Sequence, residues 1–184
     1  MDNFYNRWQD YRSKKLAFLA ELLLKLKISA NIMTFFSLLF GVLAVYFLFQ
    51  NYYLFLLFTF LHLFADSLDG VLARKTKVTK FGEYSDYFVD RLMELLLLLK
   101  IAYAYYLQDY FPLLVLAFFL FTQTVYLFSR FQAPITFART LMFIVLLFSP
   151  INLFLFSTLA YLLAGIFYLF AFSQQIGGFV KKRF

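Results

Sequence analysis

The feature that most limits how this chain can fold is a series of long apolar runs separated by short polar breaks. A helix needs roughly 18 to 20 apolar residues to cross the hydrocarbon core of a membrane, and the runs approach or exceed that length. Hydrophobic residues make up 64% of the 184 residues, including 29 Phe and 14 Tyr. A soluble domain of this size could not bury so many large side chains. The sequence therefore predicts an all-α integral membrane protein.

The breaks between the runs divide the chain into six predicted transmembrane helices. Polar residues, prolines and one basic loop, Arg74–Lys80, mark the connections. We expect the six spans at 31–50, 53–73, 82–107, 112–130, 137–148 and 152–173. No soluble domain fits between them. We therefore expect one membrane domain over 1–184, with the six-helix bundle at 31–173.

The segments outside the bundle also have distinct patterns. Within residues 1–30 an apolar stripe recurs at helical spacing, with most basic residues off it; its members are Phe4, Trp8, Tyr11, Leu19 and Leu22. This pattern predicts an amphipathic helix that lies in the membrane interface. Residues 174–184 are expected to form a basic tail.

Most of the Lys and Arg residues gather on one side of the predicted bundle. They occur before the first span, after the second, around the fourth connection and at the C-terminus, and the opposite connections contain none. Because cytoplasmic loops carry the excess of Lys and Arg, both termini are predicted to be cytoplasmic. Topology and contact with anionic lipid head groups thus explain the net charge of +7, and we expect no nucleic-acid partner.

Acidic side chains interrupt the apolar pattern at the end of the second predicted span and the start of the third. Asp66 and Asp69 are three residues apart, and Asp86 and Asp90 are four apart, so each pair shares one helix face. An ionised carboxylate near mid-membrane costs about 2.5 to 3.5 kcal/mol, so these groups need compensation. The short loop makes the two helices antiparallel neighbours, and the four carboxylates can converge below the cytoplasmic surface.

Such a cluster is suited to hard divalent cations. Oxygen ligands favour Mg²⁺, Mn²⁺ or Ca²⁺ over zinc, and four negative charges match two divalent ions. The chain has no Cys and one His, which excludes cysteine and histidine-rich metal sites. The acids could instead form structural salt bridges with Arg74, Arg91 and the loop lysines. Two register-matched pairs favour the functional interpretation, because ionisable clusters inside membranes usually mark functional sites.

The spacing of these acids resembles the signature of the CDP-alcohol phosphatidyltransferases, D-x-x-D-G-x-x-A-R followed by G-x-x-x-D-x-x-x-D. All signature residues are present in order: Asp66, Asp69, Gly70, Ala73, Arg74, Gly82, Asp86 and Asp90. The spacer from Arg74 to Gly82 is one residue shorter than is usual in that family, which leaves both acid registers unchanged. The segment Ile28–Thr34 is also similar to the family's entry to the first span, with Ala30 where the family has Pro.

This resemblance implies an enzyme of phospholipid biosynthesis. It would transfer a phosphatidyl-type group from a CDP-linked lipid, ester- or ether-linked, to a hydroxyl acceptor and release CMP. The resemblance further implies two Mg²⁺ or Mn²⁺ ions held by the four aspartates, with Asp90 also acting as general base. Gly70, Ala73, Arg74 and Gly82 would bind the CDP group. It also implies a homodimer. The charge bias places the predicted active site on the cytoplasmic side.

Two arginines suggest the class of acceptor. Arg130 and Arg139 lie at the predicted cytoplasmic ends of the fourth and fifth spans, in a region loosely similar to that of the inositol-phosphate-using and archaeal members. Paired guanidinium groups suit a phosphate, which accepts bidentate hydrogen bonds. We therefore expect a phosphorylated polyol, with inositol phosphate ahead of glycerol phosphate. Ordinary topology anchors are an equally simple interpretation of both arginines.

Three other functions can be compared with this one. An intramembrane prenyltransferase also binds a diphosphate through aspartates, but that class resembles a larger bundle. An intramembrane cation-binding or transport protein could use the same acids, although the adjacent basic loop would repel cations. The shortened spacer is also compatible with a catalytically impaired homologue that keeps all the acids.

Overall fold

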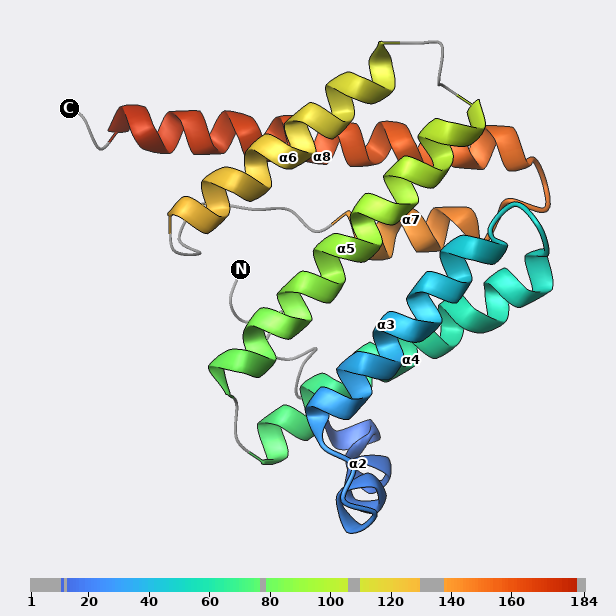
Figure 1. The fold of residues 1–184 in the computed structure, drawn as a ribbon, viewed down its shortest axis with the longest axis vertical. Helices are drawn as coiled ribbons and strands as arrows, with labels where there is room; N and C mark the ends of the chain where they lie inside the picture. Colours follow the sequence, from blue (N-terminus) through green and yellow to red (C-terminus); the bar gives the residue numbers. More distant parts are fainter. Residues whose placement is uncertain (1–10, 12, 77–78, 106–109, 130–137, 182–184) are drawn as a thin grey trace. The chain divides into compact units, whose positions relative to one another are not determined.

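The computed structural model describes residues 11, 13–76, 79–105, 110–129 and 138–181. These ranges contain helices and the turns between them, and no strand. The helices, labelled in Figure 1, are α2 (Ala17–Lys25), α3 (Ala30–Phe47), α4 (Tyr52–Lys75), α5 (Lys80–Tyr105), α6 (Phe111–Phe128), α7 (Arg139–Leu146) and α8 (Leu153–Lys181). The prediction of an all-α protein is confirmed.

Each of the six predicted spans corresponds to one helix, from α3 to α8. In the described part of the chain, four segments are long and apolar enough to cross a membrane: Ala30–Phe47, Tyr52–Lys75, Phe111–Phe128 and Leu153–Gly177. α5 has 26 residues but carries several charged side chains. α7 has 8 residues, which extend about 12 Å against a hydrocarbon core of about 30 Å. The structure thus supports an integral membrane protein with four candidate spans.

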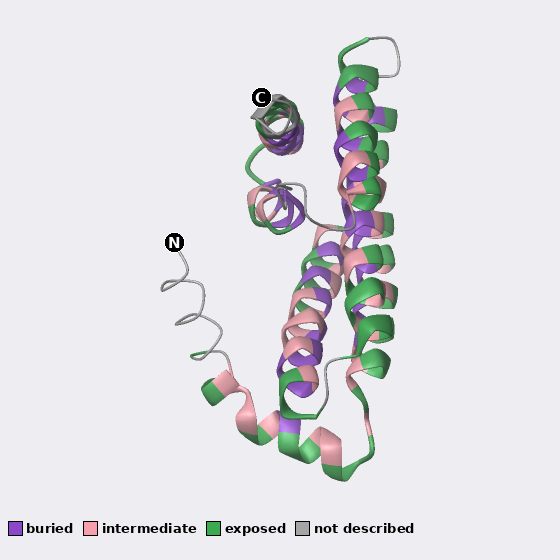
Figure 2. Ribbon diagram, turned by 90° about the vertical axis from the view of Figure 1, so that its left-hand side faces the viewer, coloured by how far each residue is buried: buried purple, intermediate pink, exposed green. Residues whose placement is uncertain are grey.

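α3 places small and polar residues inside and large apolar residues outside. α3 buries Thr34, Ser37, Gly41, Ala44 and Val45. Its exposed side chains include Ile32, Phe35, Phe36, Leu39, Val42 and Tyr46. Figure 2 shows that buried and exposed residues both occur along the length of the helices. This distribution is expected where lipid surrounds the helices, because small residues let helices approach closely and large apolar ones face the hydrocarbon.

The described chain divides into two compact units, residues 1–93 and 94–184. In the first unit α3 lies alongside α4, and α2 packs against α4 (Figure 1). At the α3–α4 interface the buried His62 lies 2.8 Å from the Ser37 carbonyl oxygen through Nδ1, which therefore carries the proton. Gly41 faces Met93 and His62 so closely that a side chain there would overlap Met93 Sδ.

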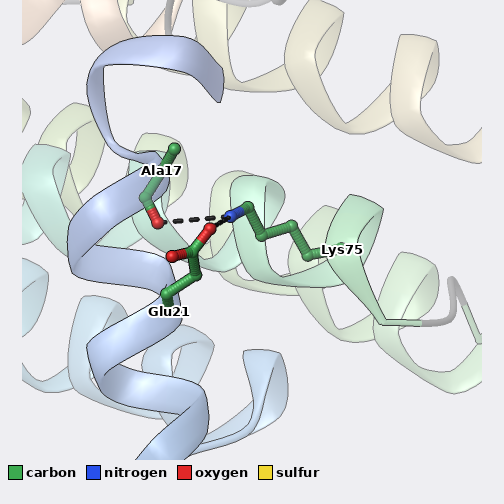
Figure 3. Close-up of polar contacts among 3 residues, drawn as sticks. All are labelled: Ala17, Glu21 and Lys75. Carbon is green, nitrogen blue, oxygen red and sulfur yellow. Dashed lines mark hydrogen bonds and ion pairs between the residues drawn. The ribbon is translucent and has the colours of Figure 1, made fainter.

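The N-terminal helix α2 is fixed to the end of α4. Lys75 Nζ donates to Glu21 Oε1 at 2.6 Å and to the Ala17 carbonyl oxygen at 3.2 Å (Figure 3). Ala20 is buried against Val71 and Leu72. The outer surface of this segment exposes Tyr11, Phe18, Leu22 and Leu26. Their spacing places them on one helix face, as expected for an amphipathic helix in the membrane interface.

In the second unit α8 packs against both α6 and α7. Polar side chains there contact backbone groups: Glu94 Oε1 accepts from the Ala138 N–H at 2.8 Å, and Tyr161 OH donates to the Pro112 carbonyl at 3.1 Å. Gln175 Nε2 donates to the Thr122 carbonyl at 3.1 Å. These bonds are valuable in a membrane protein because the hydrocarbon offers no alternative partner.

The last helix is longer than predicted. The span was expected to end at Ser173, where the apolar run stops, but α8 continues to Lys181. The loss of hydrophobicity marks the end of the apolar run, whereas a helix continues while its backbone hydrogen bonds can form. Residues 174–181 contain no proline to interrupt them, and the buried Gln175 packs on α6. Much of the predicted tail is therefore helical.

The docking of α2 gives a prediction about charge. The pKa of the Glu21 carboxyl is lowered from its ordinary value of 4.5, chiefly because Lys75 donates a hydrogen bond to the charged form and attracts it. A lowered pKa means that the ion pair stabilises docking above pH 4.5 and is lost as the pH falls through the lowered value. At pH 7 we expect Lys75→Glu to accelerate amide hydrogen exchange in residues 17–25, and the swapped pair Lys75→Glu with Glu21→Lys to restore slow exchange.

The control is Lys14→Glu, which makes the same change of charge on the exposed surface of this segment. It should leave exchange in α2 unchanged. Equal exchange in Lys75→Glu and the unmodified protein would contradict the assigned docking contact.

Candidate functional site

Three carboxylates from two helices meet in the first unit. Asp66 and Asp69 on α4 and Asp86 on α5 each offer one oxygen atom, and these atoms all lie within 4.8 Å of one another. Asp69 is buried, with 5% exposed, whereas Asp66 is half-buried and Asp86 is exposed. Asp90 is outside this group, one helical turn further along α5, and its Oδ1 atom is buried. The structure thus brings together three of the four predicted acids.

Local helix geometry explains this arrangement. α4 runs without a break to Lys75, so residues three apart remain on one face. α5 begins immediately after Thr79, whose Oγ1 accepts a hydrogen bond from the Gly82 N–H at 3.1 Å, as a helix N-cap does. This cap fixes the start of α5, and the cap position together with the helical repeat sets where Asp86 lies.

A residue of α3 holds the most buried acid. Thr34 Oγ1 donates to Asp69 Oδ2 at 2.9 Å, and this bond is buried. Thr34 was not among the predicted site residues. It belongs to the segment Ile28–Thr34, whose similarity to the family gave a signal but no role. The contact could not be derived from spacing, because it joins residues 35 apart in sequence.

A cavity of about 200 Å³ opens beside the carboxylates. All four predicted CDP-binding residues line it, namely Gly70, Ala73, Arg74 and Gly82, and so do Asp69 and Asp86. The cavity is also lined by Ala30, Asn31, Thr34, Thr79 and Glu83, which were not predicted. The cavity lining therefore combines acidic, basic and amide side chains with two glycines, which have no side chain.

The two glycines of the cavity differ in how much room surrounds them. A Cβ atom added to Gly70 would have Arg74 Nη1 as its nearest neighbour, at 3.5 Å, which is an ordinary van der Waals contact. One added to Gly82 would lie 3.1 Å from Thr79 Oγ1 and 3.4 Å from Asn31 Oδ1. Protein atoms therefore leave space at Gly70, whereas Gly82 is already closely packed.

Arg74 reaches back from the end of α4 over this cavity. Its Nε donates to Ser13 Oγ at 3.2 Å, and its Nη1 lies near Gly70. The side chain is exposed and can meet an anion entering the cavity. The N-terminal segment therefore contacts the residue predicted to bind phosphate or cytosine.

An apolar groove of about 390 Å³ adjoins the cavity. It runs between α3 and α5, and its apolar lining comprises Phe35, Leu38, Phe81, Tyr84, Phe88 and Val89. Asn31 and Thr34 line both the groove and the cavity. A polar compartment and an apolar one thus share a wall in the first unit.

The remaining polar residues of interest lie elsewhere. His62, one turn before Asp66, is fully buried and contacts Ser37, as expected for a core histidine. Arg139 is buried at the start of α7 in the second unit, with 6% exposed. Arg130 lies outside the described residues.

Comparison with known proteins identifies the family. The model of the CDP-alcohol phosphatidyltransferase family matches residues 27–177, which include all of the helices from α3 to α7 and most of α8. The chain belongs to this family, a family of membrane transferases that use a CDP-alcohol and an alcohol acceptor. No curated protein and no solved structure matched the chain.

The acid cluster fits the divalent metal that this family uses. Two oxygens on opposite sides of a bound Mg²⁺ are about 4.2 Å apart, since each lies about 2.1 Å from the ion. Oxygen atoms within 4.8 Å of one another can therefore surround one such ion after small side-chain movements. The ligands are all carboxylates, which suits a hard cation.

The unequal surroundings of the glycines predict unequal effects on stability. We expect Gly41→Ala to lower the unfolding temperature in detergent, because overpacking against Met93 costs about 1 to 3 kcal/mol. Gly70→Ala should leave the unfolding temperature unchanged or slightly raised, since the new methyl group meets no close neighbour and alanine favours a helix. Equal destabilisation by both substitutions would show that Gly70 is a packing glycine.

Proposed function

We propose that this protein transfers a phosphatidyl-type group from a CDP-linked lipid to a hydroxyl acceptor and releases CMP. The observation that carries the proposal is the meeting of three acids with the cavity that all four non-acidic signature residues line. A structural salt-bridge cluster would not require that open space beside it. The family assignment supplies the reaction class, and the residue roles below are our proposals.

Asp66, Asp69 and Asp86 are proposed to hold divalent metal, with Asp90 sharing a second ion. We propose Mg²⁺ or Mn²⁺, because the ligands are oxygen atoms only. When bound, two such ions would neutralise the diphosphate and stabilise the charge that develops on the leaving group. Asp69, which accepts a hydrogen bond from Thr34, and the exposed Asp86 both line the cavity.

Asp90 is proposed to act on the acceptor hydroxyl as general base. The hydroxyl oxygen forms a bond to the lipid-side phosphorus, the bond from that phosphorus to the bridging oxygen breaks, and CMP leaves with the electron pair. The proton of the hydroxyl passes to the Asp90 carboxylate. The position of Asp90 supports this division of roles, since it lies one turn from the three-acid group and a base should not be fully engaged in metal binding.

The cavity is proposed to take the CDP group. Gly70 lets a ligand approach the α4 backbone, because it has no side chain and protein atoms leave space there. Arg74 lies beside it with a guanidinium group that can pair with phosphate. If Gly70→Ala folds normally, a loss of CMP affinity in that variant reports on the cavity itself.

The adjoining apolar groove is proposed to take a lipid chain of the donor. Phe35, Phe81 and Phe88 line the groove and are 61%, 69% and 61% exposed, so a chain seated there would cover apolar surface. The shared wall at Asn31 and Thr34 matches a donor whose charged head is joined to an apolar tail.

Arg130 and Arg139 are proposed to bind a phosphorylated acceptor, with inositol phosphate ahead of glycerol phosphate. Arg139 is buried next to Ala138, whose N–H donates to the Glu94 carboxylate. A buried guanidinium is held by its surroundings and can receive a phosphate with little loss of side-chain entropy.

Cytoplasmic termini and a cytoplasmic active site are proposed on the distribution of charge, and six spans require α7 to cross the membrane together with the residues that flank it. Arg74, Lys75 and Lys80 lie at the ends of α4 and α5 near the cavity, which the positive-inside rule assigns to the cytoplasm. We propose a homodimer on the family resemblance.

The direct test of the function is metal-dependent CMP release. Purified protein in lipid vesicles should release CMP from a CDP-lipid when Mg²⁺ or Mn²⁺ and a suitable alcohol are present, and chelation should stop turnover. Asp66→Asn, Asp69→Asn and Asp86→Asn should each lower kcat by at least about 100-fold, and Asp90→Asn likewise, since each removes a ligand or the base.

The matched control is Glu83→Gln, which removes a carboxylate from the cavity lining outside the signature. It should retain most turnover. Metal and nucleotide binding without CMP release in the unmodified protein would indicate a catalytically impaired homologue. Metal flux across vesicles without nucleotide binding would indicate a transport protein.

The acceptor is tested with a panel of alcohols and one arginine pair. Replacing Arg130 and Arg139 with Gln should raise the KM for inositol phosphate or glycerol phosphate by about 10-fold or more and leave the KM for the CDP-lipid unchanged. Consumption of unphosphorylated alcohols alone would contradict the proposed acceptor class. An unchanged acceptor KM would mean that both arginines are topology anchors.

A further inference from the structure

The hydrogen bond between Thr34 and Asp69 joins two helices at the most buried acid of the cluster. Thr34 is 6% exposed and Asp69 is 5% exposed, and their oxygen atoms are 2.9 Å apart. The hydroxyl can donate to the carboxylate, which accepts through Oδ2. This bond restricts rotation of the carboxyl group and leaves its other lone pairs available to a cation.

Thr34 is itself held firmly. Its Oγ1 also lies 3.2 Å from the Ala30 carbonyl oxygen, one turn earlier on α3. A β-branched side chain in a helix has few χ1 rotamers, and this second contact favours the rotamer that points the hydroxyl back along the helix. The hydroxyl therefore has a fixed position from which to orient Asp69.

Thr34 also occupies a position at the boundary of two compartments. It lines the cavity beside Asp69 and Asp86 and also lines the apolar groove. Its single hydroxyl proton has two nearby acceptors, and the Asp69 carboxylate at 2.9 Å is closer than the Ala30 carbonyl at 3.2 Å. The contact therefore joins α3 to the acid cluster.

We propose that Thr34 is a positioning residue for divalent metal, setting the orientation in which Asp69 presents its carboxylate. This proposal rests on the metal site of the proposed function. Hydrogen bonds to ligating carboxylates orient them, and loss of such a partner typically lowers metal affinity about 10- to 100-fold.

The same helix provides a matched control for this role. Ser37 lies about one turn further along α3, is fully buried, and has its Oγ 3.0 Å from His62 Nδ1 on α4. Both hydroxyls therefore contact α4 from α3, but only Thr34 contacts a member of the acid group. Ser37→Ala removes a similar contact between helices while leaving Asp69 untouched.

The experiment measures Mn²⁺ binding to the full-length protein in detergent through the electron paramagnetic resonance signal of free Mn²⁺. Thr34→Val, which keeps the shape of the side chain and removes the hydroxyl, should weaken binding about 10- to 100-fold. Thr34→Ser, which keeps the hydroxyl, should restore affinity close to that of the unmodified protein. Ser37→Ala should bind Mn²⁺ as the unmodified protein does, even where its unfolding temperature falls.

Other outcomes overturn the proposal. Equal Mn²⁺ affinity in Thr34→Val and the unmodified protein would do so, as would an equal loss in Ser37→Ala. If Thr34→Val does not fold, Thr34→Ala replaces it, and failure of both while Ser37→Ala folds would show that the hydroxyl serves folding. Absence of Mn²⁺ binding in the unmodified protein would instead contradict the metal site of the proposed function.

Discussion

Repulsion among carboxylates in a largely apolar helix pair is the constraint on which the first unit depends. Asp66, Asp69 and Asp86 place oxygen atoms within 4.8 Å of one another, where like charges repel and burial weakens solvation. The fold reduces this repulsion by giving each of the three acids a different environment. Asp86 remains exposed, Asp66 is half-buried, and the buried Asp69 accepts a hydrogen bond from Thr34. The negative charge that remains on the three carboxylates favours a divalent cation. The same repulsion therefore accounts for the packing around the acids and for the proposed metal site.

Close approach of α3 and α4 makes that arrangement possible. Gly41 allows Met93 and His62 to approach the α3 backbone, and Ser37 contacts His62 through its hydroxyl and carbonyl oxygens. Without a hydrophobic driving force between helices in lipid, small residues and hydrogen bonds between helices must provide the association. The same interface that binds the two helices together therefore also carries Thr34 to Asp69.

The sequence was sufficient for the features that depend on local periodicity. The apolar runs predicted the six helices from α3 to α8, and the i, i+3 spacing placed Asp66 and Asp69 on one face. It was insufficient where tertiary contacts decide. α8 continues past Ser173, where the buried Gln175 donates to the Thr122 carbonyl of α6, and α7 ends at Leu146 although its predicted span ran to 148.

Hydrogen-bond partners of side chains could not be predicted from the sequence either. No residue spacing indicates that Thr34 contacts Asp69 or that Glu94 accepts from the Ala138 N–H. Both contacts bring together residues that are far apart in the chain. In each case a polar group was recognisable in the sequence, and its need for a partner followed from burial. Which partner it would find depends on how the helices pack.

The polar cavity and the apolar groove of the first unit share one short segment of α3. Asn31 and Thr34 are separated by about one helical turn near the start of α3, so both lie on the same side of the helix. On one side of them are Asp69, Asp86 and Arg74, and on the other are Phe35, Tyr84 and Phe88. The proposed donor, a CDP-linked lipid, joins a charged head group to an apolar chain, so one ligand of this kind can contact both surfaces at once.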